Sequence, residues 1–327
     1  MKGIVYKEVG SPNLLKVSEL KKPIPKDNQV LIKVKASSIS ILEYMRFVKP
    51  VEQGRPSFSF RLIDSVILGS EGKVLGNDIA GVVEEIGNSV KRYKKGDEVF
   101  GLTTGIFGGW AEYALAGEDT VCLKPAHLTF KEASAIASSG VTALGAVKAA
   151  NIREGCQVLV HGASGGVGQY VVQLAKAFGG VVTAVCSTRN LEMVRSIGAD
   201  FTIDYKREDF TKCGKFFDAI IAINGYNTLR TYKMLLNDGG SYIVVGGAKQ
   251  ALMGMFGGPF YSIGSGKKFS AVAYPKMPKQ EYLTILEEYA EAGKIILLLT
   301  RFILYTKYQR RSDILLITTR KGKWLSM

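Results

Sequence analysis

The sequence is poor in the residues from which metal centres and disulfide frameworks are built. Among its 327 residues it has only two histidines and four cysteines: Cys122, Cys156, Cys186 and Cys213. No two of these cysteines form a Cys-x-x-Cys pair. Structural zinc lobes and disulfide frameworks need closely spaced cysteines, so we expect neither. Scattered thiols are typical of a reducing compartment.

Long hydrophobic runs are also missing. The longest apolar stretch starts at Ile295–Leu299 and continues with interruptions to Tyr305, too short and broken to cross a bilayer. The first ten residues, MKGIVYKEVG, contain neither the apolar centre nor the cleavage site of a signal peptide. We therefore expect a cytoplasmic protein without a membrane span. The composition, 46% hydrophobic and 22% charged, is that of a globular protein with a sizeable core.

The chain is long enough for two domains, and its patterns divide accordingly. Up to about residue 124, short or alternating apolar runs at Ile4–Tyr6, Val30–Ala36 and Ala80–Ile86 are separated by Gly and Pro, which predicts a β-rich domain. From about residue 125, strands and helices alternate, which predicts a parallel sheet with helical crossovers.

The second region predicts the following elements. The expected strands are Val158–Val160, Val181–Cys186, Phe201–Ile203, Ala219–Ile223 and Tyr242–Val245. The expected helices are Phe130–Ala150 with a break at Gly140, Gln169–Phe178, Leu191–Ile197 and Glu281–Ala292, the last ending at Gly293.

The strongest motif is VLVHGASGGVGQYVVQLAKAFGG, from Val158 to Gly180. A buried strand leads into three spaced glycines and directly into a helix, the arrangement that holds a dinucleotide pyrophosphate against backbone N–H groups. The alternative is a tight strand-to-helix turn without a ligand. The candidate cofactor-binding residues here are Gly162, Ala163, Ser164, Gly165, Gly166, Val167 and Gly168.

The end of the next strand predicts which dinucleotide binds. NAD-binding proteins place a carboxylate there for the ribose 2′-OH, but this chain has Cys-Ser-Thr-Arg-Asn at Cys186–Asn190. Ser187 and Arg189 can bind a 2′-phosphate, which favours NADPH, with NADH as the alternative. An ordinary exposed arginine is the alternative interpretation of Arg189.

Three further residues follow strand ends, where doubly wound sheets bind ligands. Tyr205 is expected near the adenine, or else as a simple strand-end aromatic. Asn224 and Gly246 follow the fourth and fifth strands, where they would lie against the nicotinamide and its ribose. Simple turns are the alternative for both.

Four segments in order resemble the medium-chain dehydrogenase/reductase superfamily, above all its zinc-independent quinone oxidoreductases and NAD(P)-dependent alcohol dehydrogenase-like proteins. They are Gly76–Gly101, Gly108–Leu115, His161–Gly168 and Val185–Tyr205. The resemblance implies an α/β protein with a GroES-like catalytic domain (1–124), a Rossmann NADP-binding domain with a doubly wound parallel sheet (125–270) and a C-terminal return to the catalytic domain (271–327). It also implies a homo-oligomer.

The resemblance places this chain apart from the zinc members of that superfamily. Where they carry a Cys ligand and a Gly-His-Glu set, this chain has Ser40 and Gly76-Asn77-Asp78. Without thiolate or imidazole ligands, we expect no metal site. Lacking a Lewis acid, the enzyme is expected to reduce acceptors that take hydride readily, namely quinones and α,β-unsaturated carbonyls.

By the same resemblance, Ser40, Glu43 and Tyr44 face the substrate as candidate catalytic residues. Relatives more often have Asn and Asp at the first two positions, so this chain departs from the pattern there. Tyr44 can donate a hydrogen bond to a developing oxyanion. The alternative for the group is a helix start, in which Ser40 is the N-cap and Glu43 closes a capping box.

The last 32 residues do not resemble the family, which continues with a Pro-Val-Ile-Asp strand and a final Lys-Gly-Lys-Val-Val-Ile strand. Read one nucleotide earlier, codons compatible with this tail permit PVIDKVYPL, VSEAIRYF and KGKVVI in order. We therefore predict that about Ile296–Met327 is translated from a shifted frame; a divergent tail is the alternative. The tail carries +6 of the formal charge of +14, so the remaining chain carries +8.

Two other functions compete with quinone or enone reduction. A zinc-free alcohol or carbonyl dehydrogenase would share the same cofactor loop. An RNA-binding or structural relative without turnover is permitted by the basic charge. The sequence, however, has no RNP motif and no interleaving of aromatic and basic residues, so a nucleic-acid partner is not expected.

Overall fold

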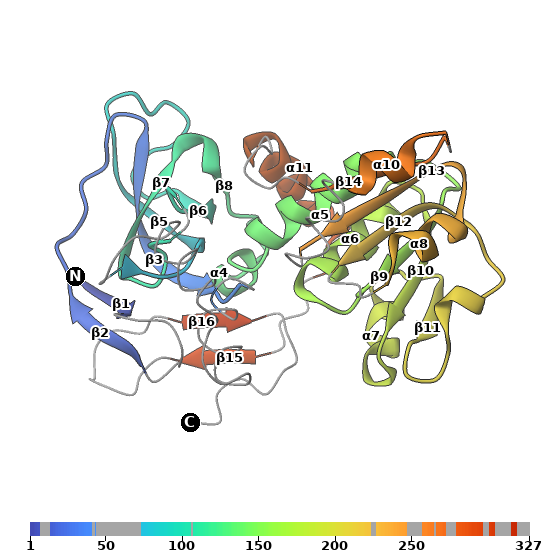
Figure 1. Ribbon diagram of the computed structural model, residues 1–327. Coiled ribbons are helices and arrows are strands. Elements are labelled where there is room, and N and C mark those ends of the chain that lie inside the picture. Colours follow the sequence, from blue (N-terminus) through green and yellow to red (C-terminus); the bar gives the residue numbers. More distant parts are fainter. Residues whose placement is uncertain are drawn as a thin grey trace. The chain divides into compact units, whose positions relative to one another are not determined.

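The computed structural model describes residues 1–6, 14–40, 43, 73–105, 107–223, 227–246, 257–264, 266–272, 279–296, 301–304 and 315–318. The chain forms two compact units (Figure 1). The first unit comprises Met1–Ser138, Lys279–Glu287 and Leu297–Met327, and the second comprises Ser139–Pro278 and Glu288–Ile296. In the described part of the chain, no helix has the length and apolar character needed to cross a membrane.

The first unit is built from two mostly antiparallel sheets. A three-stranded sheet has the order β2 (Leu15–Glu19), β1 (Lys2–Tyr6), β4 (Lys73–Val74). The larger sheet has the order β15-β16-β3-β5-β6-β8, with β7 paired to β3. Its strands are β3 Gln29–Ser38, β5 Asp78–Ile86, β6 Glu98–Leu102, β7 Tyr113–Gly117, β8 Val121–Leu123, β15 Arg301–Leu304 and β16 Leu315–Thr318.

Alternating side chains of the larger sheet form the core of this unit. Val30 and Ile32 of β3 pack with Ile79 and Val83 of β5 in one buried cluster. The alternation identified in the sequence therefore corresponds to one face of the sheet turned to the core, as period-two patterns predict. This packing fixes the end of β3, which the candidate catalytic residues Ser40 and Glu43 follow in the chain.

The second unit contains a parallel sheet with the order β11-β10-β9-β12-β13-β14. All of its strand pairs are parallel. The strands are β9 Gln157–His161, β10 Val181–Cys186, β11 Phe201–Asp204, β12 Phe217–Ile223, β13 Leu236–Val245 and β14 Lys268–Ala271. The chain order along the sheet is thus 3-2-1-4-5-6, the doubly wound arrangement that the sequence predicts.

Helices connect these strands, as the alternating pattern indicates. They are α6 Gly166–Ala177, α7 Leu191–Ser196, α8 Leu229–Leu235 and α10 Gly258–Ser262. Outside this set lie α4 Phe130–Ala133, α5 Ala137–Ala149 and α11 Lys279–Glu291. Gly293, with φ +66°, follows α11, as expected for a residue that ends a helix.

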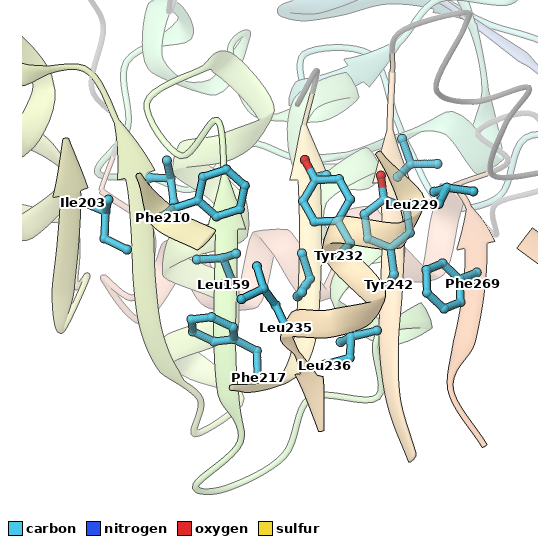
Figure 2. Packing of buried hydrophobic residues seen from close by; sticks show 14 residues of the cluster. Leu159, Ile203, Phe210, Phe217, Leu229, Tyr232, Leu235, Leu236, Tyr242 and Phe269 are labelled. Carbon is cyan, nitrogen blue, oxygen red and sulfur yellow. The ribbon is translucent and has the colours of Figure 1, made fainter. Parts of the chain in front are cut away.

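Aromatic side chains fill one face of the parallel sheet (Figure 2). Tyr232 of α8 stacks on Tyr242 of β13, with ring centroids 4.6 Å apart and an interplanar angle of 28°. Phe210 and Phe269 extend this row on either side, with centroids 6.2 Å from Tyr232 and 5.5 Å from Tyr242, respectively. The cluster holds α8 on the sheet, because each aromatic side chain buries a large apolar area.

Two expectations about helices are wrong. The predicted break at Gly140 does not occur, because Gly140 lies buried inside α5; the helical stretch is interrupted at residues 134–136 instead. Burial outweighs the roughly 1 kcal/mol helix cost of a glycine, while the Ser134 hydroxyl donates to the Lys131 carbonyl at 2.9 Å and ends α4. The sequence interpretation also missed α8, although its N-cap Thr228 is visible.

Candidate active site

The glycine loop occupies the point where the strand order of the parallel sheet reverses. β9 ends at His161 between β10 and β12, and α6 begins at Gly166. Gly162 has φ +87°, and a Cβ there would lie 2.3 Å from the Ile223 carbonyl oxygen at the end of β12. Only glycine satisfies both constraints. Ligands of doubly wound sheets bind at this reversal point.

The next two glycines of the motif differ in their surroundings. A Cβ on Gly168 would lie 2.2 Å from the Gly162 carbonyl oxygen, so this glycine allows α6 to approach the loop. Among the described residues, a Cβ on Gly165 would meet nothing closer than the Gly162 carbonyl oxygen at 3.4 Å. The space over Gly165 is therefore open at the N-terminus of α6, where free N–H groups and the helix dipole favour a phosphate. The loop fits a dinucleotide pyrophosphate.

The other loop residues either hydrogen-bond to neighbouring segments or form the start of α6. The Ala163 N–H donates to the Val185 carbonyl at 3.2 Å and ties the loop to β10. Gly166 and Val167 form the first turn of α6, half-buried. The Ser164 hydroxyl accepts a hydrogen bond from Asn190 Nδ2 at 3.0 Å.

Asn190 connects the loop with the end of β10, a role that the sequence interpretation missed. It is 8% exposed, and its Nδ2 also donates to the Ser187 hydroxyl at 3.1 Å. Ser164 and Ser187 are thereby held on either side of one amide. Asn in a turn after a strand carries no special sequence signal, so only the fold could identify this contact.

The candidates for the 2′-phosphate and for the adenine lie at neighbouring strand ends. Ser187 is buried after β10, and Arg189 is exposed two residues later. Tyr205 follows β11 with 55% of its surface exposed, and its N–H donates to the Cys186 carbonyl at 3.1 Å. This hydrogen bond places Tyr205 beside Cys186, the residue that precedes Ser187.

A carboxylate that the sequence interpretation did not consider ends β11. Asp204 accepts a hydrogen bond from the Thr188 hydroxyl at 2.5 Å and from the Lys206 N–H at 3.0 Å. The Thr188 hydrogen bond is the main reason why the pKa of Asp204 is below its usual range. Arg207 Nε lies 3.8 Å from the same carboxylate. Its oxygens are therefore occupied by the protein, on the third strand rather than the second.

His161 contributes no charge to the phosphate region. Its Nδ1 lies 2.9 Å from the Tyr232 hydroxyl, and its ring lies 4.8 Å from that of Phe210. Burial lowers the pKa of His161 to about 4. The imidazole is neutral at neutral pH, so it serves to fix the end of β9 against the aromatic cluster.

Of the two remaining cofactor candidates, the structure describes Gly246 but not Asn224. Gly246 follows β13 with φ +70°, a conformation that favours glycine, and no atom of the described residues lies within 4 Å of a Cβ placed there. Asn224 lies outside the described residues. Tyr44, the third catalytic candidate, lies outside them as well.

Ser40 and Glu43 contact each other after β3. The Ser40 N–H and hydroxyl both donate to Glu43 Oε2, at 2.8 and 2.5 Å. The backbone contact is one half of a capping box, as the alternative interpretation predicts. Glu43 is nevertheless only 2% exposed, and its Oε1 is buried without a hydrogen-bond partner among the described residues. A surface cap would not leave such an atom.

Asp78, at the start of β5, is a second buried carboxyl of the same unit. It is 1% exposed and accepts hydrogen bonds from the N–H and hydroxyl of Ser138 in α5, at 2.5 and 2.6 Å. Burial is the main reason why the pKa of Asp78 rises to about 6, and the charge of Glu43 adds to it. The sequence interpretation noted Asp78 only as a departure from the zinc pattern.

The donor set at the zinc positions does not fit zinc. Ser40 is bonded to Glu43, Asp78 to Ser138, and Asn77 Oδ1 accepts from the Thr103 hydroxyl at 3.4 Å. None of these three side chains offers a thiolate or an imidazole, the ligands that zinc prefers. Within the described residues, no group of three or more His, Cys, Asp or Glu side chains is arranged to hold a metal ion.

Two family models match the chain. The alcohol dehydrogenase GroES-like domain matches residues 26–127, and the zinc-binding dehydrogenase domain matches residues 166–288. The fold and these matches define a two-domain, nicotinamide-dependent dehydrogenase or reductase.

Known relatives narrow this class. The chain is 36% identical over 256 residues to the quinone oxidoreductase of Homo sapiens, covering 75% of this chain and 73% of that protein. It is 37% identical over 258 residues to a 2-methylene-furan-3-one reductase of Solanum lycopersicum, covering 76% of this chain but only 63% of that enzyme. A quinone oxidoreductase structure from Coxiella burnetii superposes with a TM-score of 0.74 at 28% identity, covering 90% and 88% of the two chains.

The chain therefore belongs to the medium-chain dehydrogenase/reductase family, within its quinone oxidoreductase group. Membership makes it an NAD(P)H-dependent oxidoreductase with a GroES-like domain and a Rossmann-type domain, as predicted from the sequence.

Proposed function

We propose that the chain is a zinc-independent reductase that uses NADPH to reduce a quinone or an α,β-unsaturated carbonyl. The observation that carries the proposal is a pair of features: an open dinucleotide loop over Gly165, and a donor set at Ser40, Asn77 and Asp78 that does not suit zinc. Acceptors that need no Lewis acid fit this combination best.

The cofactor would be held mainly by the glycine loop and by the ends of β10 and β11. Residues Gly162–Gly168 would bind the pyrophosphate, and Asn224 and Gly246 the nicotinamide and its ribose. Ser187 and Arg189 would bind the 2′-phosphate, and Tyr205 would lie near the adenine. When bound, the cofactor supplies a hydride. NADPH is favoured over NADH because Arg189 can pair with a 2′-phosphate and no carboxylate follows β10.

The protein's own contribution would be to orient the acceptor and to stabilise the negative charge that develops on it during reduction. Ser40, Glu43 and Tyr44 would face the acceptor. A tyrosine hydroxyl is a suitable donor to an oxyanion as negative charge develops there. Ser40 is held by Glu43, which fixes the position of both groups before substrate arrives. We also propose a homo-oligomer, whose size light scattering would determine.

Product analysis with labelled cofactor tests the reaction class. The purified protein is incubated with deuterated NADPH and a simple enone, with a chelator present, and the product is analysed by mass spectrometry. We expect one deuterium at the β-carbon of the saturated ketone. A protein that instead oxidises simple alcohols, loses activity with chelator, or leaves the enone unlabelled would contradict the proposal. Salt-sensitive RNA binding that NADPH does not displace would favour the binding-protein alternative.

A further inference from the structure

Two buried carboxyl groups lie in the first unit at the end of β3 and the start of β5. Glu43 is 2% exposed and Asp78 is 1% exposed. Acidic side chains are almost never buried this deeply unless they are paired with a cation or neutralised by a proton. No cation is paired with either carboxyl among the contacts of the described residues, and the charged group that acts on Asp78 is Glu43.

The hydrogen bonds of the two groups are unequal. Asp78 has two donors from Ser138 and a further hydrogen bond from the Ser38 side chain, all of which favour its ionised form. Burial and the charge of Glu43 oppose these bonds and raise the pKa of Asp78. Glu43 uses one oxygen for Ser40, while the other is buried without a partner in the described structure.

Two like charges in one desolvated region are costly, so such pairs commonly keep one proton. We propose that Glu43 and Asp78 hold a single proton as a pair, and that this proton is transferred to the acceptor after its reduction. The inference rests on the proposed reductase function. Glu43 would be the group that delivers the proton, since its Oε1 is buried without a hydrogen-bond partner among the described residues, and Asp78 would be a positioning residue that keeps the proton available.

The proton step balances without a further redox partner. Reduction of an enone at its β-carbon leaves an enolate anion. The O–H bond of the carboxyl breaks, its electron pair stays on the carboxylate, and the proton forms a new bond to the enolate. The pair then carries two negative charges and regains one proton from water, which resets it for the next turnover.

A purely structural role for Asp78 is the competing explanation. In that case its carboxylate caps the first turn of α5 through Ser138 and carries no proton of functional use. Asp78→Asn separates the two explanations, because the amide can preserve both contacts. Its Oδ1 would accept the Ser138 N–H, and its Nδ2 would donate to the Ser138 hydroxyl, which is also an acceptor.

The first measurement uses the cofactor-free protein and is independent of activity. Infrared difference spectra are recorded across a titration from pH 4.5 to 8 for the wild type, Asp78→Asn and Glu43→Gln. We expect the band of a protonated carboxyl to disappear around pH 6 in the wild type, to be absent around that pH in Asp78→Asn, and to disappear at lower pH in Glu43→Gln. Asp119→Asn, an exposed carboxyl of the same unit, serves as the control and should keep the band.

The second measurement is the pH profile of kcat/KM for enone reduction. In the wild type we expect kcat/KM to fall about tenfold per pH unit above the pKa of the pair. Asp78→Asn should move this fall to lower pH, since the second negative charge that opposes loss of the shared proton is then absent. Glu43→Gln should lower the rate about 100-fold or more at every pH.

The outcomes separate the failure of this inference from failure of the proposed function. A wild type that reduces enones, but whose pH profile and infrared band are unchanged in Asp78→Asn, overturns the proton-sharing pair alone. A wild type that shows the titrating band but reduces no quinone or enone overturns the proposed function. A normal pH profile together with an unchanged melting temperature in Asp78→Asn would assign Asp78 to capping, against the inference.

Discussion

Replacing Gly165 with alanine should weaken cofactor binding about 100-fold while leaving the fold intact. Gly165 has φ −78° and ψ 171°, which any residue adopts, and an added Cβ would meet no atom of the described residues closer than 3.4 Å. A Gly→Ala change at a compatible position stabilises a protein by roughly 0.4–1 kcal/mol through the unfolded chain. The new methyl group, however, would occupy the open space over the first turn of α6.

The cost to binding follows from the hydrogen bonds that the methyl group would block. Bonds from backbone N–H groups to a charged phosphate contribute about 1.5–3 kcal/mol each. Losing one or two of them weakens binding by roughly 3 kcal/mol, which is about 100-fold in Kd. Gly168→Ala is the matched contrast, because its Cβ would lie 2.2 Å from the Gly162 carbonyl oxygen. Such a clash with backbone should cost about 1–3 kcal/mol of stability.

Two assays decide the matter. NADPH fluorescence titration gives Kd, and thermal unfolding gives Tm, for the wild type, Gly165→Ala and Gly168→Ala. We expect Gly165→Ala to keep or slightly raise Tm while losing NADPH, and Gly168→Ala to lose both stability and binding. If Gly165→Ala bound NADPH within twofold of the wild type, the pyrophosphate would not lie over this loop, and the reasoning would be refuted.

Three further predictions concern other parts of the chain. The folded pKa of His161 is about 4 against about 6.5 unfolded, so its stabilising contribution is complete above pH 6.5 and is lost as pH falls. Between pH 7.5 and 5, urea unfolding should show a loss of stability that is about 2 kcal/mol larger in the wild type than in His161→Asn; equal losses would contradict it. Arg189→Ala should weaken NADPH binding about tenfold and leave NADH binding within twofold; equal weakening of both would count against a 2′-phosphate contact. Sequencing the gene on both strands should reveal a one-nucleotide shift near Ile296, and the restored chain should melt several degrees higher; an unambiguous in-frame sequence ends that hypothesis.

Much of the parallel sheet could be predicted because its strands are buried on both faces. Val181–Cys186 matches β10 at both ends, and Val158–Val160 lies within β9. Such strands appear as short runs of apolar, largely β-branched residues between glycines. The glycine loop was also predictable, because its glycines are required by local geometry. At Gly162 and Gly168 the neighbouring backbone leaves no room for a Cβ atom.

The contacts around the site could not be predicted from the sequence. Asp78 and Ser138 are 60 residues apart, and Ser164 and Asn190 are 26 apart. Local patterns contain no information about which polar side chains meet across such separations. Burial of Glu43 is a similar case, because Ser-x-x-Glu indicates a capping box and, by itself, a solvent-exposed one. The tertiary fold, not the motif, makes that carboxyl unusual.

The most direct test of the account is the initial rate of cofactor oxidation with a simple quinone, measured with NADPH and with NADH in the presence of a chelator. We predict turnover that is unaffected by the chelator and is clearly faster with NADPH at limiting cofactor. Turnover that requires a metal would contradict the interpretation of Ser40, Asn77 and Asp78. The absence of both turnover and NADPH binding, in a protein shown to be folded and carrying the restored tail, would contradict the assignment of the glycine loop.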